Sequence, residues 1–220
     1  MESNEQSAID DNYRIELLRK AIHLCSLSIP MAYYFIPRAT ALSLIIPVAA
    51  VFITLDIARF YSTGVREWFH SAFGHLLRKH ERDNENKRLN GASYLLISAI
   101  ICILIFPKII TVTSFSILII SDLSAALIGK RFGKRRFLGK TLEGSLGFFI
   151  SGVIVVALAP KIEYHFGEYL IGIAGALIGA VVEASPMDID DNLSVPLSVG
   201  AVMWTLYLWA MPTLNIYNIM

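Results

Sequence analysis

The stretch that decides the fold class is a pair of apolar runs, GASYLLISAIICILIF at 91–106 and IITVTSFSILIISDLSAALI at 109–128, separated only by Pro107 and Lys108. Each run is close to the roughly 20 residues that a helix needs to cross a hydrocarbon core of about 30 Å. Five further runs of similar length lie near 21–37, 39–58, 142–160, 167–184 and 194–212. The sequence therefore predicts an all-α integral membrane protein, with seven transmembrane helices in a single membrane domain over 1–220.

The composition agrees with a membrane protein and excludes an ordinary soluble domain. Of the 220 residues, 55% are hydrophobic and only 17% are charged, and the charges are crowded into a few stretches. A soluble domain would spread its charges along the chain. Cys25 and Cys102 both fall inside apolar runs, where a lone thiol behaves as a small hydrophobe, so neither is expected to bind a metal or form a disulfide.

The distribution of basic residues predicts which end faces the cytoplasm. With seven crossings, the polar head 1–20 and the loops 59–90, 129–141 and 185–193 share one side, and they hold sixteen of the nineteen Lys and Arg residues. Basic loops stay in the cytoplasm. We therefore expect these four segments to be cytoplasmic, in the cell inner membrane or its equivalent, with the C-terminus outside.

The loop 59–90 contains a helical pattern of its own. Apolar residues recur at a spacing of three and four along one face, opposite a basic face, which is typical of a helix that lies in the membrane interface. The apolar stripe consists of Val65, Trp68, Phe69, Ala72, Phe73, Leu76 and Leu77.

Acidic residues inside the apolar runs point to a functional site. An acid at the centre of a membrane helix costs roughly 2.5 to 3.5 kcal/mol on insertion scales, so it is usually kept for a task. Four acids, all expected toward the cytoplasmic ends of their helices, are Asp56, Asp122, Glu143 and Glu183. The loop 185–193 adds Asp188, Asp190, Asp191 and Asn192 and contains no Lys or Arg, so a nearby cation is expected.

The loop 129–141, GKRFGKRRFLGKT, is suited to binding phosphate because it combines six basic residues with glycines that let backbone amides approach a ligand. Hard carboxylate oxygens without accompanying His or Cys favour Mg²⁺ or Mn²⁺ over zinc. Carboxylates, a metal and a basic loop are the components of phosphoryl or nucleotidyl transfer. The spacing of the loop does not match a Walker motif, and a basic loop that only fixes topology and contacts anionic lipid is the simpler alternative.

Three segments carry a family resemblance. The runs RKAIHL at 19–24, SDLSAALIGKRFGKRRFLGKTLEGS at 121–145 and EASPMDIDDNLSVPL at 183–197 resemble the signature of the CTP-dependent lipid kinases, which comprise dolichol, phytol and diacylglycerol kinases and are related to phosphatidate cytidylyltransferases. One departure is Thr141, where the family pattern has a serine; it keeps the hydroxyl group.

The resemblance implies CTP as phosphate donor, Mg²⁺ or Mn²⁺ as metal and a membrane lipid alcohol as acceptor. Phosphatidate cytidylyltransferase is the alternative activity, ion-coupled transport is a remote one, no nucleic acid is expected as a partner, and the roles of His23 and of an oligomer stay open. The site residues expected are Asp122, Asp191 and Glu143 for catalysis, Asp122, Asp190 and Asp191 for the metal, and Gly129, Lys130, Arg131, Gly133, Lys134, Lys140 and Asn192 for the nucleotide.

Overall fold

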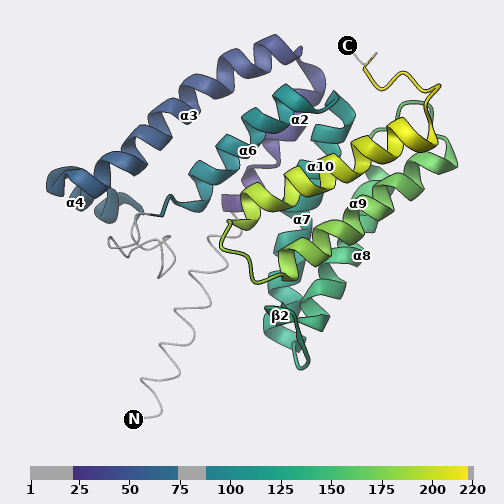
Figure 1. Cartoon of the computed structure of the whole chain (residues 1–220). Coiled ribbons are helices and arrows are strands. Elements are labelled where there is room, and N and C mark those ends of the chain that lie inside the picture. The colour runs from purple at the N-terminus through teal and green to yellow at the C-terminus, as the bar shows by residue number, and fades with distance from the viewer. Residues whose placement is uncertain (1–21, 74–87, 218–220) are drawn as a thin grey trace.

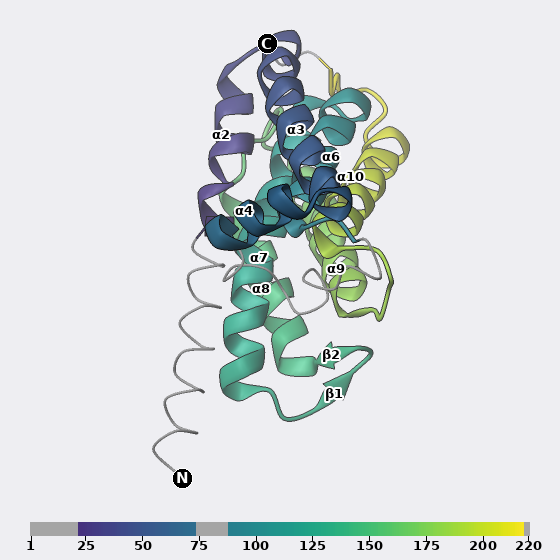
Figure 2. The ribbon, with the colours of Figure 1, turned by 90° about the vertical axis from the view of Figure 1, so that its left-hand side faces the viewer.

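Helices make up most of the part of the chain that the computed structural model describes, which is residues 22–73 and 88–217 (Figure 1). One short hairpin, β1 (Arg136–Phe137) and β2 (Lys140–Thr141), lies at the tip of a protruding helix pair (Figure 2). The helices are α2 (Ser28–Phe35), α3 (Arg38–Tyr61), α4 (Thr63–Phe73), α6 (Gly91–Ile105), α7 (Lys108–Phe132), α8 (Leu142–Leu158), α9 (Phe166–Ala184) and α10 (Asp191–Ala210).

The all-α class is confirmed, whereas the count of seven crossings is not shown. By length and composition, α3, α7, α9 and α10 can each cross a membrane, and α6 and α8 are apolar but shorter. The run expected at 21–37 is divided, because a turn at 26–27 separates an initial helical segment from the eight residues of α2. The expected head 1–20 lies outside the described residues.

Helix α7 is the centre of the molecule. It contacts α2, α6, α8, α9 and α10. Its consecutive residues Ile117, Leu118 and Ile119 are all fully buried, which is possible only for a helix surrounded by protein on every side. Helix α3, in contrast, packs on α6 and α4 and exposes large apolar side chains such as Leu44 and Val51. Such a surface suits a lipid environment, where apolar side chains need no cover.

Glycines let neighbouring helices approach closely. A Cβ atom added at Gly172 of α9 would lie 2.5 Å from Val156 of α8, and one added at Gly200 of α10 would lie 2.4 Å from the ring of Phe106. In lipid, close packing between helices replaces the hydrophobic driving force that water would supply. Even alanine would therefore separate these helices.

The three Lys and Arg residues outside the predicted cytoplasmic segments, Arg38, Lys108 and Lys161, bind carbonyl groups at helix ends. Arg38 donates to the carbonyl of Phe106 at 2.7 Å, and Lys108 donates to that of Ile36 at 3.0 Å. Lys161 donates to two carbonyls at the end of α8, at 2.5 and 2.8 Å. Cations at helix C-termini satisfy unpaired carbonyls and interact favourably with the helix dipole. These charges therefore have a local structural purpose.

Glu168 corrects the expectation that every intramembrane acid lies toward one end. It is fully buried near the start of α9, at the end of the molecule opposite the hairpin. Its carboxylate accepts hydrogen bonds from the backbone amides of Ile162 at 2.8 Å and of Glu163 and His165, both at 3.0 Å. The Tyr207 hydroxyl lies 3.4 Å away. Glu168 therefore closes the α8–α9 loop and gives no support to a transport path.

The amphipathic pattern in 59–90 does form a helix, α4, at the end of α3. On its stripe, Phe69 is buried whereas Trp68 is about half exposed. Leu76 and Leu77, the last residues of the predicted stripe, lie outside the described residues. The position of α4 in the membrane interface stays a prediction.

Candidate active site

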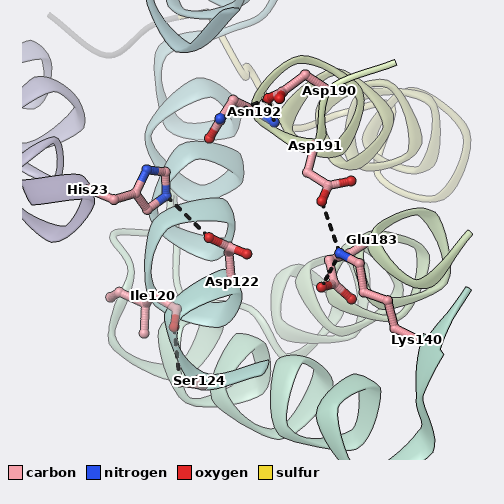
Figure 3. A network of polar contacts seen from close by, with 9 residues as sticks. All are labelled: His23, Ile120, Asp122, Ser124, Lys140, Glu183, Asp190, Asp191 and Asn192. Carbon is pink, nitrogen blue, oxygen red and sulfur yellow. Dashed lines mark hydrogen bonds and ion pairs between the residues drawn. The ribbon is translucent and has the colours of Figure 1, made fainter. Parts of the chain in front are cut away.

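The site is built around the ammonium group of Lys140, which lies between two carboxylates (Figure 3). Its Nζ is 2.5 Å from Glu183 Oε1 and 2.9 Å from Asp191 Oδ2. The Glu183 side chain is only 4% exposed, whereas that of Lys140 is 41% exposed. Three elements thus meet here: β2, the last turn of α9 and the first turn of α10.

The hairpin places Lys140 at this position. Phe137 pairs with Lys140 across the two strands, and the turn between them contacts the end of α9. There the Gly139 amide donates to the carbonyl of Ala184 at 2.8 Å. A Cβ at Gly139 would lie 3.2 Å from that carbonyl oxygen and 3.3 Å from Pro186. The absence of a side chain at Gly139 therefore permits the docking that brings Lys140 to the two acids.

Asp190 and Asn192 form the N-terminal cap of α10. Asp190 Oδ1 accepts hydrogen bonds from the Asn192 amide nitrogen at 2.9 Å and from its side-chain Nδ2 at 2.8 Å. The Asn192 carbonyl in turn accepts from the buried Ser98 hydroxyl at 2.7 Å. An aspartate at this position satisfies a free amide at the start of a helix. The cap fixes the orientation of Asp191, the next residue.

Asp122 joins the cluster from the central helix α7. It is close enough to Glu183 and Asp191 for their charges to interact. On its other side, Asp122 Oδ2 is 3.8 Å from His23 Nε2, and both side chains are only about 15% exposed. Asp122 therefore lies between His23 and the group formed by Lys140, Glu183 and Asp191, which we call the Lys140 cluster, as Figure 3 shows.

The ammonium group of Lys140 brings a positive charge among the carboxylates of the cluster. Burial alone lowers the pKa of Lys140, but the charges of Asp191 and Glu183 and their hydrogen bonds raise it above its usual value. Lys140 therefore stays protonated and supplies one positive charge against three carboxylates. Glu183 Oε2 is buried and has no hydrogen-bond partner among the described residues. Such an oxygen is available to a ligand cation.

The donor set fits a hard divalent ion, although the expected ligands are not gathered around one point. Within residues 22–73 and 88–217, no three Asp, Glu, His or Cys side chains converge closely enough to enclose a metal. The set Asp122, Asp190 and Asp191 thus does not form a closed site. Mg²⁺ on a nucleotide needs only one or two protein carboxylates, because phosphates and waters complete its shell. Asp122, Glu183 and Asp191 supply carboxylate oxygens of the right kind.

The other predicted residues lie at the base of the hairpin, away from Lys140. Lys130 and Arg131 are exposed in the last turn of α7. Glu143 Oε2 accepts hydrogen bonds from the backbone amides of Lys134 at 3.0 Å and Arg135 at 3.3 Å. Glu143 thus fixes the backbone of the basic loop, and its catalytic role stays a prediction.

The glycines of the basic loop have a packing reason. A Cβ at Gly133 would lie 2.2 Å from the Gly129 carbonyl and 2.8 Å from Thr141 Cγ2. Thr141 caps α8, because its hydroxyl oxygen accepts from the Gly144 amide at 3.2 Å. Serine or threonine can form this cap, so the departure from the family pattern at Thr141 keeps the interaction. Nucleotide binding by Gly129 and Gly133 stays a prediction.

The structure also reveals residues that sequence reasoning did not assign. Beside Lys140 and Asp191 lies a cavity of about 260 Å³, whose wall includes Arg88 and Tyr94. Tyr94 stands inside an apolar run and Arg88 is one of many basic residues in its loop, so neither carried a signal. The sequence indicates Glu183 as an unusual acid within an apolar run. Its pairing with Lys140 could not be predicted, because the two residues lie in segments far apart in the chain.

Comparison with known proteins gives relatives of named activity. No family model matches the chain, and no solved structure matches it. An uncharacterized protein of Rickettsia prowazekii is 30% identical over 86% of this chain and 93% of its own length. CTP-dependent diacylglycerol kinase 1 of Schizosaccharomyces pombe is 30% identical over 69% of this chain and 74% of its own. A probable chloroplastic phytol kinase of Triticum aestivum is 32% identical over 56% of this chain and 47% of its own.

Proposed function

The chain belongs to the family of CTP-dependent lipid kinases, and from this membership we propose that it transfers the γ-phosphate of CTP to the hydroxyl group of a membrane lipid alcohol. A diacylglycerol kinase and plant phytol kinases are among its relatives, and both names describe phosphorylation of a lipid alcohol. The observation that carries the proposal is the Lys140 cluster, in which the partly exposed Lys140 and several carboxylates, among them the buried Glu183, meet at one end of the helices.

Lys140 is the residue proposed to bind the phosphate that is transferred. Its ammonium group now donates to Glu183 and Asp191, and small rotations of a flexible side chain would redirect it to phosphate oxygens. The exposed Lys130, Arg131 and Lys134 extend the positive charge toward the rest of the triphosphate. Neutralising and positioning the phosphates supplies most of the catalysis in phosphoryl transfer.

Asp122 is the proposed acceptor of the hydroxyl proton. The lipid oxygen forms a bond to the γ-phosphorus, the bond from that phosphorus to the bridging oxygen breaks, and CDP leaves. The proton of the lipid hydroxyl passes to the Asp122 carboxylate, which lies between His23 and the Lys140 cluster. Asp122 also lies close enough to Glu183 and Asp191 for their charges to interact, which places it next to the proposed phosphate site.

Asp191 and Glu183 are the residues proposed to hold Mg²⁺ together with the nucleotide, which leaves Asp122 to accept the proton. The ion would neutralise charge on the phosphate oxygens during transfer. Asp190 would act indirectly, because the Asp190 cap of α10 orients Asp191.

The membrane topology is part of the proposal. We infer seven crossings, formed by α2 with the helical segment before it, α3, α6, α7, α8, α9 and α10, with the hairpin and the loop 185–190 in the cytoplasm. Six of these helices are apolar, four of them long enough on their own to cross. Sixteen of the nineteen Lys and Arg residues then lie on the cytoplasmic side.

The test uses purified protein in detergent with Mg²⁺, lipid alcohols and phosphatidate, and CTP labelled at either the α or the γ phosphorus. We expect label in the lipid alcohol from γ-labelled CTP only, with release of CDP. Label from the α position would instead identify a phosphatidate cytidylyltransferase. No label from either position, in protein shown to be folded by size exclusion, would refute nucleotide-dependent lipid chemistry.

A further inference from the structure

The cavity beside Lys140 is lined in part by residues that the proposed phosphate chemistry does not use. It lies between the first turn of α6 and the loop from Ser185 to Asp191. Its lining includes Lys140 and Asp191, the residues proposed to meet the phosphates. It also includes Arg88, Tyr94 and Asp188, which have no part in that phosphate chemistry.

The size of the cavity suits part of a nucleotide. At about 260 Å³ it is slightly smaller than the roughly 300 to 1,000 Å³ of pockets that enclose a drug-sized ligand. Apart from Lys140, the exposed lysines and arginines of the basic loop, Lys130, Arg131, Lys134, Arg135 and Arg136, are not part of its lining. A nucleotide whose phosphates lie at Lys140 would therefore have its base and sugar inside the cavity and its charged tail beside the hairpin.

Tyr94 gives the cavity an aromatic wall. It stands in the first turn of α6, and its side chain is partly buried. Its hydroxyl lies close enough to Arg88 and Asp190 for charge interaction. An aromatic ring at the side of a cavity is a surface on which a nucleobase stacks, with a contribution of about 1 to 3 kcal/mol per base.

Arg88 and Asp188 supply a hydrogen-bond pattern that matches cytosine. Arg88 NH2 lies 3.4 Å from Asp188 Oδ1, and both side chains have room to turn toward a ligand, since they are 47% and 98% exposed. Cytosine presents an amino group that a carboxylate accepts from and, beside it, two acceptor atoms suited to a guanidinium. Uracil has a carbonyl in place of that amino group, and Asp188 would repel it.

The segment from Arg88 to Tyr94 is held in place by buried contacts. The Arg88 carbonyl accepts from Arg59 at 2.9 Å, and the Asn90 amide donates to Asp56 Oδ2 at 2.8 Å. Asn90 also caps α6 by accepting from the Ser93 amide at 2.9 Å. A wall fixed before the ligand arrives loses little entropy on binding.

We propose that this cavity binds the cytosine base and ribose of the donor nucleotide, with Tyr94 stacked on the base and with Arg88 and Asp188 selecting cytosine over uracil. This inference rests on the proposed function, because it takes the phosphates to lie at Lys140. It adds the residues that choose the nucleotide.

The experiment measures equilibrium binding of CTP, UTP and inorganic tripolyphosphate to purified protein with Mg²⁺. Tyr94→Ala is expected to weaken CTP binding about tenfold or more, the lower part of the stacking range, and to leave tripolyphosphate binding unchanged. Tyr94→Phe is expected to retain CTP affinity, since stacking needs only the ring. The matched control is Tyr164→Ala, a residue 65% exposed at the opposite end of the molecule.

Asp188→Asn tests selectivity separately. Its amide can donate to the uracil carbonyl, so the preference for CTP over UTP is expected to fall at least fivefold. Glu163→Gln, an exposed acid at the opposite end, should leave that preference unchanged.

Failure of this inference and failure of the proposed function are distinguishable. If wild type and Tyr94→Ala bind CTP with the same affinity, and both bind tripolyphosphate, the base site alone is overturned. Folded wild-type protein that binds neither CTP nor tripolyphosphate would overturn the proposed function and the base site with it. Tripolyphosphate binding also shows whether each variant is folded.

Discussion

The buried ion pair between Asp56 and Arg59 is the contact whose loss should be most costly. Both side chains are 0% exposed, and Arg59 Nε lies 2.7 Å from Asp56 Oδ1. The second carboxylate oxygen accepts from the Asn90 amide and the Ser93 hydroxyl, both at 2.8 Å. The pair thus joins the end of α3 to the start of α6. We expect Arg59→Met to destabilise the protein strongly.

The magnitude follows from the charge that would remain. Removing one partner of a buried pair leaves an uncompensated buried charge and costs about 3 to 5 kcal/mol. Arg59 also lies over the rings of Phe60 and Phe69, at 4.7 and 5.1 Å from their centres. Methionine keeps part of that packing, and Asp56 keeps two hydrogen bonds. We therefore expect Arg59→Met to lower the free energy of unfolding by about 3 kcal/mol, the lower end of this range.

The double variant Asp56→Asn with Arg59→Met is the control. It has no buried charge and should be more stable than Arg59→Met alone, which a double-mutant cycle detects. The assay is equilibrium unfolding in mixed micelles of increasing SDS content, followed by tryptophan fluorescence. A cost below about 1 kcal/mol for Arg59→Met, or additive effects in the double variant, would refute the reasoning from buried charge.

Three further predictions concern the proposed site and its topology. Asp122→Asn and Asp191→Asn should each remove most turnover while the protein stays folded, because asparagine keeps the shape and loses the charge; Mg²⁺ titration of activity checks this, and near-normal turnover in both would make these acids structural. Lys140→Ala should weaken CTP binding more than Lys134→Ala, because only Lys140 contacts the carboxylate cluster; equal CTP affinity in both variants and wild type would remove the basic loop from the site. A cysteine replacing Arg135 should not react with an impermeant thiol reagent applied to intact cells, and labelling from outside would overturn the proposed topology.

The amino-acid sequence was sufficient to predict the helices and the end of the molecule where the acids gather. Six of the seven apolar runs each correspond to one helix, because a backbone in lipid must satisfy its own hydrogen bonds, and the run at 21–37 is divided by a turn. Asp122 and Asp191, predicted from the family pattern to share one site, lie close enough for their charges to interact. Hydropathy is a property of a short segment, and so is the free-energy cost of an acid within an apolar run. Both can therefore be read from the sequence alone.

Only the tertiary structure decided which charges pair and what each does. Asp56 looked like a site acid until it was seen to pair with Arg59, while Glu168 proved to be a cap at the opposite end. Lys140 was one of six basic residues in its loop, and the docking of the hairpin on α9 selected it as the partner of Glu183. These outcomes depend on contacts between distant segments, which local patterns in the sequence do not determine.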